Sequence, residues 1–120
     1  MAESRLQDWP NLTESIRKGL ASEVRGRMVE SLLLRNLQPL DIIRIRTSEG
    51  KVYLFEMIDS RGPFRGIVVY VGMTANVPLG ECYLDAVLAV GDHFGLKIKK
   101  SEAMVYIPTI ERIEILEKRD

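Results

Sequence analysis

Residues 40–58, which read LDIIRIRTSEGKVYLFEMI, form the clearest structural signal in the chain. Side chains of alternating character run along both halves of this stretch, and a short segment with Gly50 at its centre separates the halves. Two period-2 runs rich in β-branched and aromatic residues, joined by a glycine-containing turn, are typical of an antiparallel hairpin. The stretch therefore predicts two paired strands at the heart of a β-rich domain.

Further short runs of the same kind follow the hairpin. We expect strands at residues 64–73, 86–90, 94–99, 103–107 and 110–116, and a loop at residues 74–80, where Pro78 and Gly80 occur. The run 64–73 is apolar on both faces, which predicts that the N-terminal segment or a second subunit covers its outer side. Pro108 interrupts strand pairing or marks a sheet edge.

The N-terminal third has a different periodicity. Apolar residues recur at every fourth position, which favours an amphipathic helix over residues 11–36 that stops before Pro39. Either Asn11 or Thr13 is the expected N-cap, and the segment is either one helix or two that break near a glycine. The repeating positions are Leu12, Ile16, Leu20, Val24, Met28 and Leu32.

Three consecutive leucines, Leu32, Leu33 and Leu34, end this segment. They cannot all lie on one helical stripe. The run is therefore either buried on more than one side within the monomer or part of a subunit contact.

Taken together, these patterns predict a mainly β protein. We expect a small antiparallel bent sheet or partly open barrel of about six short strands, preceded by an N-terminal amphipathic helical segment. The predicted organisation is a loosely ordered lead-in at 1–10 with Trp9 docked on the fold, a helical segment at 11–38, a barrel-like region at 39–116 and a tail at 117–120. All of it belongs to a single folded domain, because 120 residues are too few for two comfortable cores.

Composition narrows the function classes. Seventeen basic and seventeen acidic residues give a formal net charge of zero, which lacks the basic excess of most nucleic-acid modules. The single cysteine, Cys82, excludes an intramolecular disulfide, and with one histidine the chain has no Cys/His zinc set. No signal peptide or membrane-spanning run is recognisable, so we expect a cytoplasmic protein with no membrane association, no metal and no cofactor.

Catalytic signals are weak. No GxGxxG, GxxxxGK[ST], GxSxG or HExxH motif occurs. His93 is the only available imidazole base and lies in a turn-like segment, while Cys82 is predicted to be a small buried hydrophobe. Glu56 shares a strand face with apolar residues, and we expect that face to become solvent-exposed at the strand end, since buried glutamates are rare. The alternative is an inward Glu56, which would need a partner such as an arginine.

The most suggestive polar segment is 61–66, where Arg61 and Arg65 are each followed by a glycine and Phe64 lies between the two arginines. Guanidinium groups in such a loop bind phosphates or carboxylates well. If the strands are neighbours, a composite basic face is a second possibility; the alternative is that the same residues are the ordinary solvated charges of an outward strand face. The members of the composite basic face are Arg44, Arg46, Arg61, Arg65, Lys97, Lys99 and Lys100.

The sequence thus favours a non-enzymatic β-barrel module for binding or assembly, with a homo-oligomer or protein partner as the expected associate. The alternative is nucleic-acid or anionic-ligand binding through a basic rim formed by Arg61, Arg65, Lys97, Lys99 and Lys100. A third reading is an enzyme that uses His93 or Glu56.

Overall fold

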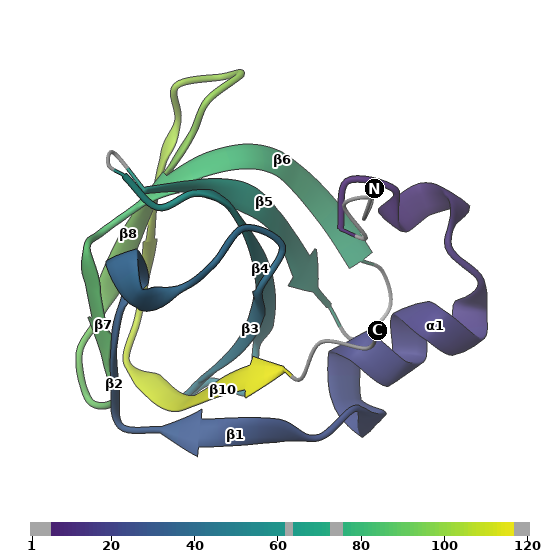
Figure 1. Cartoon of the computed structure of the whole chain (residues 1–120), viewed down its shortest axis with the longest axis horizontal. Helices are drawn as coiled ribbons and strands as arrows, with labels where there is room; N and C mark the ends of the chain where they lie inside the picture. Colours follow the sequence, from purple (N-terminus) through teal and green to yellow (C-terminus); the bar gives the residue numbers. More distant parts are fainter. Residues whose placement is uncertain (1–5, 62–63, 73–75, 117–120) are drawn as a thin grey trace.

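The computed structural model describes residues 6–61, 64–72 and 76–116, apart from the side chains of residues 22 and 23. The fold is mainly β (Figure 1). The helical elements are the 3-10 turn η1 (Trp9–Asn11), α1 (Glu14–Lys18), the π-helical turn η2 (Gly19–Glu23) and the 3-10 turn η3 (Leu34–Asn36). The strands are β1 (Gly26–Val29), β2 (Ser31–Leu33), β3 (Ile42–Thr47), β4 (Val52–Asp59), β5 (Phe64–Val71), β6 (Asn76–Leu84), β7 (Val87–Ala89), β8 (Phe94–Ile98), β9 (Met104–Ile107) and β10 (Ile110–Leu116).

Eight strands form one antiparallel sheet in the order β1-β10-β3-β4-β5-β6-β8-β9, and β2 and β7 form a second, two-stranded sheet. The large sheet curls strongly, and the small sheet lies beside the gap between its ends (Figure 1). The predicted fold class, a bent antiparallel sheet after a short N-terminal helix, is confirmed. The strand number exceeds the expected six because segments predicted as helix and loop are extended.

The hairpin at 40–58 is confirmed as β3 and β4, with Ile43 opposite Phe55 and Ile45 opposite Tyr53. Gly50 adopts φ 81° in the connecting turn, a backbone conformation that glycine reaches without strain. The Thr47 side-chain oxygen accepts a hydrogen bond from the Lys51 N–H at 3.2 Å and closes the turn. Local sequence therefore determines both the register and the turn of this hairpin.

The loop predicted at 74–80 is wrong from Asn76 onward; residues 74 and 75 lie outside the described part. β6 begins at Asn76 and pairs with β5 through a bulge, where the register shifts between Val68 and Val69. Pro78 and Gly80 flank that bulge, and Gly80 has φ 75°. Proline and glycine are tolerated within a sheet at such irregularities, which explains why turn-forming residues stand inside a strand.

One apolar core fills the inside of the curled sheet. It receives the inward side chains of nearly every strand, with Leu34, Phe55, Met57 and Ile113 fully buried. Inward residues alternate with outward ones along β4, which places Tyr53, Phe55 and Met57 inside and Leu54 on the outer face.

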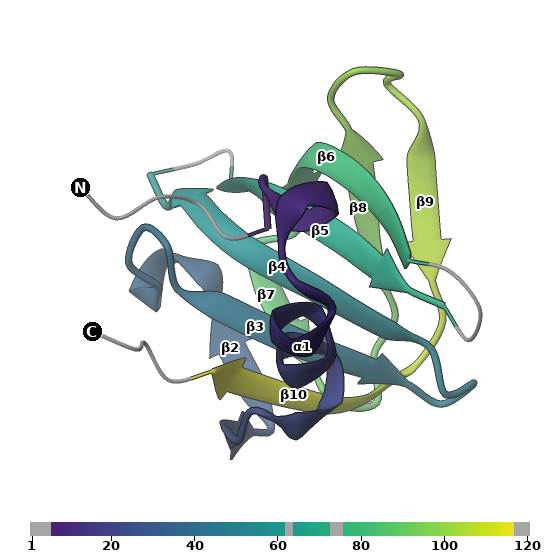
Figure 2. The same ribbon diagram turned by 90° about the vertical axis from the view of Figure 1, so that its right-hand side faces the viewer.

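A second apolar cluster covers the outer face of β3, β4, β5 and β10. Residues 6–24 lie across this face, and Figure 2 shows α1 in front of β3 and β4. Leu6, Trp9 and Leu20 pack on an apolar patch of the sheet. The sheet side of the patch consists of Ile42, Leu54, Ile67, Val69 and Leu116. The predicted cover over β5 is thus confirmed, and so is the docked position of Trp9, which is 2% exposed.

Two expectations for this region need correction. The lead-in is not loosely ordered from Leu6 onward, because Leu6 and Trp9 are buried; residues 1–5 lie outside the described part, as does the tail at 117–120. The helical segment predicted for 11–38 ends at Glu23, and its N-cap is Thr13, whose side chain accepts from the Ile16 N–H at 3.3 Å.

The chain after η2 is extended, not helical. β1 pairs with β10 from Gly26 opposite Leu116 to Val29 opposite Ile113. A spacing of four residues is also an even number of strand positions, so the apolar repeat fits either conformation. Pairing with β10 stabilises the extended conformation of β1. Gly26 allows the β1 backbone to lie close to β10, since a Cβ at this position would be 2.8 Å from the Glu114 Cβ.

Candidate functional site

A row of side chains crosses the outer face of β5, β6, β8 and β9. Arg65 lies opposite Tyr83, Tyr83 opposite Lys97, and Lys97 opposite Met104. Residues opposite each other in antiparallel strands project from the same face. The adjacent positions Cys82, Leu84 and Leu96 are buried in the inner core, so this row points outward.

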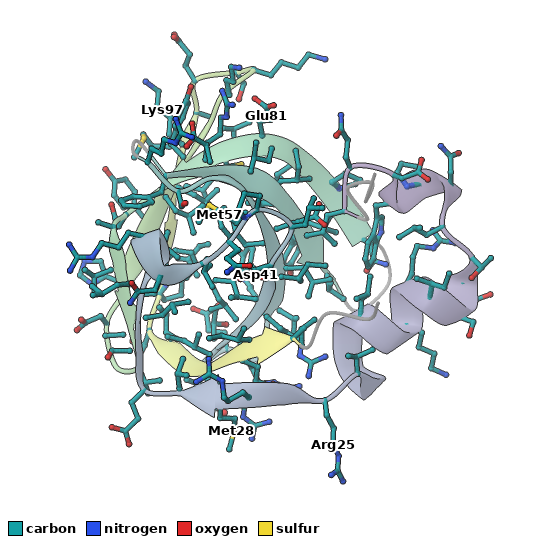
Figure 3. The ribbon with its side chains drawn as sticks, in the orientation of Figure 1. Arg25, Met28, Asp41, Met57, Glu81 and Lys97 are labelled. Carbon is teal, nitrogen blue, oxygen red and sulfur yellow. The ribbon has the colours of Figure 1, made fainter. Side chains whose placement is uncertain are left out.

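Tyr106 extends the row along β9. It is 73% exposed and lies opposite Gly95, where an added Cβ would be 3.6 Å from the tyrosine ring. Because Tyr106 stands two positions after Met104, both side chains are on the outer face. We call the set Arg65, Tyr83, Lys97, Met104 and Tyr106 the cationic–aromatic face; Lys97 lies at the upper rim in Figure 3.

Arg61 adjoins this face through a small pocket of about 280 Å³ that it shares with Arg65. The remaining lining residues are Pro39, Ile58, Asp59 and Ser60. A bulge in β4 places Asp59 opposite Arg65, and the Asp59 carboxylate accepts a hydrogen bond from the Arg61 backbone N–H at 2.9 Å. The structure therefore brings together the two arginines that the sequence singled out.

Neither guanidinium in this pocket forms an ion pair within the described part of the chain. The ion pairs there are Arg44 with Glu114, Lys51 with Glu49 and Lys99 with Glu81. Moreover, the Arg65 Nε is buried and has no hydrogen-bond partner. A buried donor without an acceptor costs about 1–3 kcal/mol, which an anion or water at this position would recover.

The lysines of the predicted basic rim divide into two kinds. Lys97 has no carboxylate partner among the described residues, whereas the Lys99 Nζ lies 3.0 Å from the Glu81 carboxylate. Lys100 is exposed in the turn between β8 and β9. Within the described residues, the cations on or beside the cationic–aromatic face that form no ion pair are therefore Arg61, Arg65 and Lys97, together with Lys100 in the adjoining turn.

Arg44 and Arg46 do not join this face, so the composite basic face is wrong in that respect. Arg44 is buried, and its guanidinium binds Glu114 and the main-chain oxygens of Leu20 and Val24. Arg46 lies opposite Val52 at the start of β4, whereas Arg65 lies opposite Asp59 at its end. About seven residues of strand, roughly 23 Å, separate these positions.

The three leucines have different environments. Leu32 and Leu34 are buried in the inner core, and Leu33 is 37% exposed and lies opposite the exposed Val87. The run is extended, so successive side chains point to opposite sides. Burial within the monomer therefore explains two of the three residues, and Leu33 remains a candidate contact.

Neither of the candidate catalytic residues, His93 and Glu56, lines the pocket that contains Arg61 and Arg65. His93 is exposed in the turn before β8. The exposure expected for Glu56 is wrong: it is 1% exposed, because residues 6–24 cover its face of the sheet. Cys82 is buried as expected, and burial raises the pKa of its thiol from 9.0 to about 11.

Sequence reasoning missed the aromatic members of the face. The alternation Glu81-Cys82-Tyr83-Leu84 would have placed Tyr83 outward had the strand been assigned there, and Met104 and Tyr106 share a period-2 pattern. The strand order, which brings these side chains beside Arg65 and Lys97, has no signal in the sequence.

Within residues 6–61, 64–72 and 76–116, no group of three or more His, Cys, Asp or Glu side chains is placed to bind a metal ion. No helix in that part has the length and apolar character needed to span a bilayer. Comparisons with protein-family models, curated proteins and solved structures find no match to this chain.

Proposed function

We propose that this chain is a non-enzymatic β-barrel binding module and that its cationic–aromatic face binds single-stranded nucleic acid. One observation carries the proposal: Tyr83 stands directly between Arg65 and Lys97 on three neighbouring strands. Small β-domains bind single strands by this combination, since cations contact the phosphates while bases stack on aromatic rings.

The charge balance around the face supports this choice of ligand. Glu81 is paired with Lys99, Asp59 accepts from the Arg61 N–H, and Asp85 accepts from the Gly95 N–H at 3.2 Å. These three carboxylates thus have an ion-pair or hydrogen-bond partner, whereas the guanidinium groups of Arg61 and Arg65 and the ammonium of Lys97 have no carboxylate partner within the described residues.

The exposed side chains favour stacking over a purely electrostatic contact. Tyr106 projects with 73% exposure and Met104 with 50%. Each base stacked on an aromatic side chain contributes about 1–3 kcal/mol. Because the chain has no net charge, stacking supplies most of the affinity and the electrostatic contribution is small.

A fluorescence-anisotropy titration with labelled DNA and RNA strands of about 12 nucleotides tests the proposal, because small barrels cover about 4–16 nucleotides. Three phosphate contacts predict a slope of log K against log salt of about −2. Tyr106→Ala is expected to weaken binding by about tenfold or more. Lys97→Gln is expected to reduce the slope by nearly one unit.

Lys51→Gln is the matched control, because Lys51 is an exposed lysine in the β3–β4 turn, away from the face. Its titration should equal that of the unmodified chain. Absence of binding at low salt would refute the proposal. If sedimentation then showed a concentration-dependent dimer that Leu33→Ser abolished, an assembly role through the exposed Leu33 and Val87 would replace it.

A further inference from the structure

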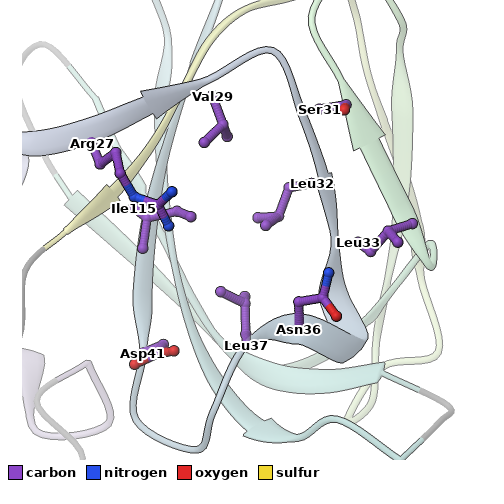
Figure 4. A pocket seen from close by; sticks show the side chains of 9 residues that line it. All are labelled: Arg27, Val29, Ser31, Leu32, Leu33, Asn36, Leu37, Asp41 and Ile115. Atoms are coloured by element: carbon purple, nitrogen blue, oxygen red, sulfur yellow. The ribbon is translucent and has the colours of Figure 1, made fainter.

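A second pocket, separate from the cationic–aromatic face, opens at the end of the barrel beside β1 and β2 (Figure 4). Its volume is about 390 Å³, within the range of about 300–1,000 Å³ in which proteins bind small molecules. β1, β2, η3 and the segment leading to β3 surround it, together with β10. Its lining consists of Arg27, Val29, Ser31, Leu32, Leu33, Asn36, Leu37, Asp41 and Ile115.

The floor of this pocket is apolar. Leu32 and Leu37 are buried members of the inner core, and Val29 and Ile115 pack against the same core. Figure 4 shows the side chains of Leu32 and Leu37 directed toward the middle of the opening, while Leu33 points away from it. A ligand seated here would therefore extend the core with its own apolar body.

The rim of the pocket is polar and carries two charged side chains, Asp41 and Arg27, whose hydrogen bonding differs. The Asp41 carboxylate accepts a hydrogen bond from the Gln38 backbone N–H at 2.8 Å, which is part of the turn leading into β3. Arg27, by contrast, has no hydrogen-bond or ion-pair partner among the described residues. Its Cα is paired with that of Ile115, and Figure 4 shows its guanidinium beside Ile115 at the edge of the opening.

An unpaired guanidinium above an apolar floor defines the ligand chemistry. Arginine binds carboxylates through two parallel N–H···O bonds, and these charge-assisted bonds are among the stronger polar contacts. The Asn36 side chain, on the opposite side of the pocket, adds an amide that donates and accepts. We propose that the barrel mouth binds a small apolar carboxylate, with its chain on Leu32 and Leu37 and its carboxylate on Arg27.

Titration of the full chain with octanoate, followed by methyl-resolved NMR and calorimetry, tests this proposal. We expect saturable shifts of the Leu32 and Leu37 methyl signals. Octanol, which has the same chain without the charge, should bind about tenfold or more weakly, since charge-assisted hydrogen bonds are the ones removed.

Arg27→Gln should weaken octanoate binding about tenfold or more and leave octanol binding unchanged. The Arg27→Gln variant is expected to fold normally, because Arg27 is exposed and is not one of the residues of the apolar core. Arg25→Gln is the matched control: this exposed arginine lies two residues earlier and does not line the pocket. It should bind octanoate as the unmodified chain does.

Three results would overturn the proposal: methyl shifts that do not saturate, equal affinity for octanoate and octanol, or unchanged octanoate affinity in Arg27→Gln. The site does not depend on the proposed nucleic-acid face. Arg27→Gln should leave oligonucleotide binding intact, and Tyr106→Ala should leave octanoate binding intact, so the two proposals can fail separately.

Discussion

The Arg44 guanidinium and the Glu114 carboxylate form a buried ion pair, with Nη2 and Oε2 2.8 Å apart, between the neighbouring strands β3 and β10. The same guanidinium donates to the carbonyl oxygens of Leu20 at 3.0 Å and Val24 at 2.8 Å. Leu20 lies in η2 and Val24 is the C-cap residue that follows it, where carbonyl oxygens lack intrahelical donors. Arg44 therefore connects the sheet to the N-terminal cover through one side chain.

Arg44→Leu should destabilise the protein by about 3–5 kcal/mol, because it leaves the Glu114 carboxylate buried without its cation. Urea unfolding measures the change. The double variant Arg44→Leu/Glu114→Leu should recover much of the loss, since it removes the stranded charge. Arg46→Leu is the control on the same strand face: Arg46 lies opposite Arg112, so its removal relieves repulsion and should cost little.

Gly66→Ala should destabilise the protein by about 1–3 kcal/mol, because a Cβ there would overlap the Glu56 main-chain oxygen and the Phe55 ring. Gly19→Ala provides the contrast. Its Cβ would make an ordinary 3.5 Å contact with Val24, and its φ of −58° is helical. That substitution should stabilise by about 0.4–1 kcal/mol. Equal effects of the two substitutions in urea unfolding would contradict this reading.

Leu34→Ala should cost about 2–5 kcal/mol, since Leu34 is fully buried in the inner core. Leu33→Ser should change the free energy of unfolding by no more than about 0.5 kcal/mol, because this side chain projects outward from β2. Urea unfolding compares the two. A large cost for Leu33→Ser in dilute protein would show that its environment in solution differs from the one described.

Cys82 makes stability decline at alkaline pH. Burial raises the pKa of its thiol from 9.0 to about 11, so the folded state retains a proton that the unfolded chain loses earlier. Its contribution is complete below about pH 9 and is lost as the pH rises to about 11. Burial likewise raises the pKa of Tyr53, which adds to the decline. In the Cys82→Ala variant, the part of the decline in unfolding free energy that is due to the thiol should disappear. Urea unfolding at several pH values between about 8 and 11 measures this change.

The same pKa predicts slow alkylation. At pH 8 the folded chain should react with iodoacetamide at least about 100-fold more slowly than the urea-unfolded chain, since two pKa units separate the thiolate fractions. Intact mass spectrometry follows the reaction. Equal rates would mean that Cys82 is reached without unfolding.

Local patterns predicted much of the fold. The hairpin around Gly50 and the strands β5, β8, β9 and β10 follow from alternation and turn residues alone. The errors arise where tertiary contacts decide. Residues 26–33 have an apolar repeat compatible with both helix and strand, and pairing with the distant strands β10 and β7 selects the extended conformation. Pro78 and Gly80 indicate a loop when the sequence is considered alone. In the structure they lie within β6, because the β-bulge opposite Val68 and Val69 accommodates both residues.

The candidate site was predictable only in part. The short spacing between Arg61 and Arg65 suggested a joint site, and a shared pocket contains both. Arg44 was assigned to the same surface because an arginine on an alternating strand is normally exposed. Its burial depends on Glu114, which is 70 residues away in sequence, and on carbonyls of the N-terminal cover. Patterns within a short stretch of sequence cannot predict a partner so far away along the chain.

The position of Pro108, directly after β9, has a consequence for how the protein behaves when concentrated. β9 is the last strand of the large sheet, so one side of its backbone has no neighbouring strand in that sheet. A bare strand edge recruits other chains and seeds fibrous growth. Proline has no backbone N–H to donate to an added strand. Backbone hydrogen bonding between β9 and a strand from another molecule is therefore limited to the four residues Met104–Ile107. Pro108 therefore limits how far an added strand could pair along the β9 edge of the open sheet.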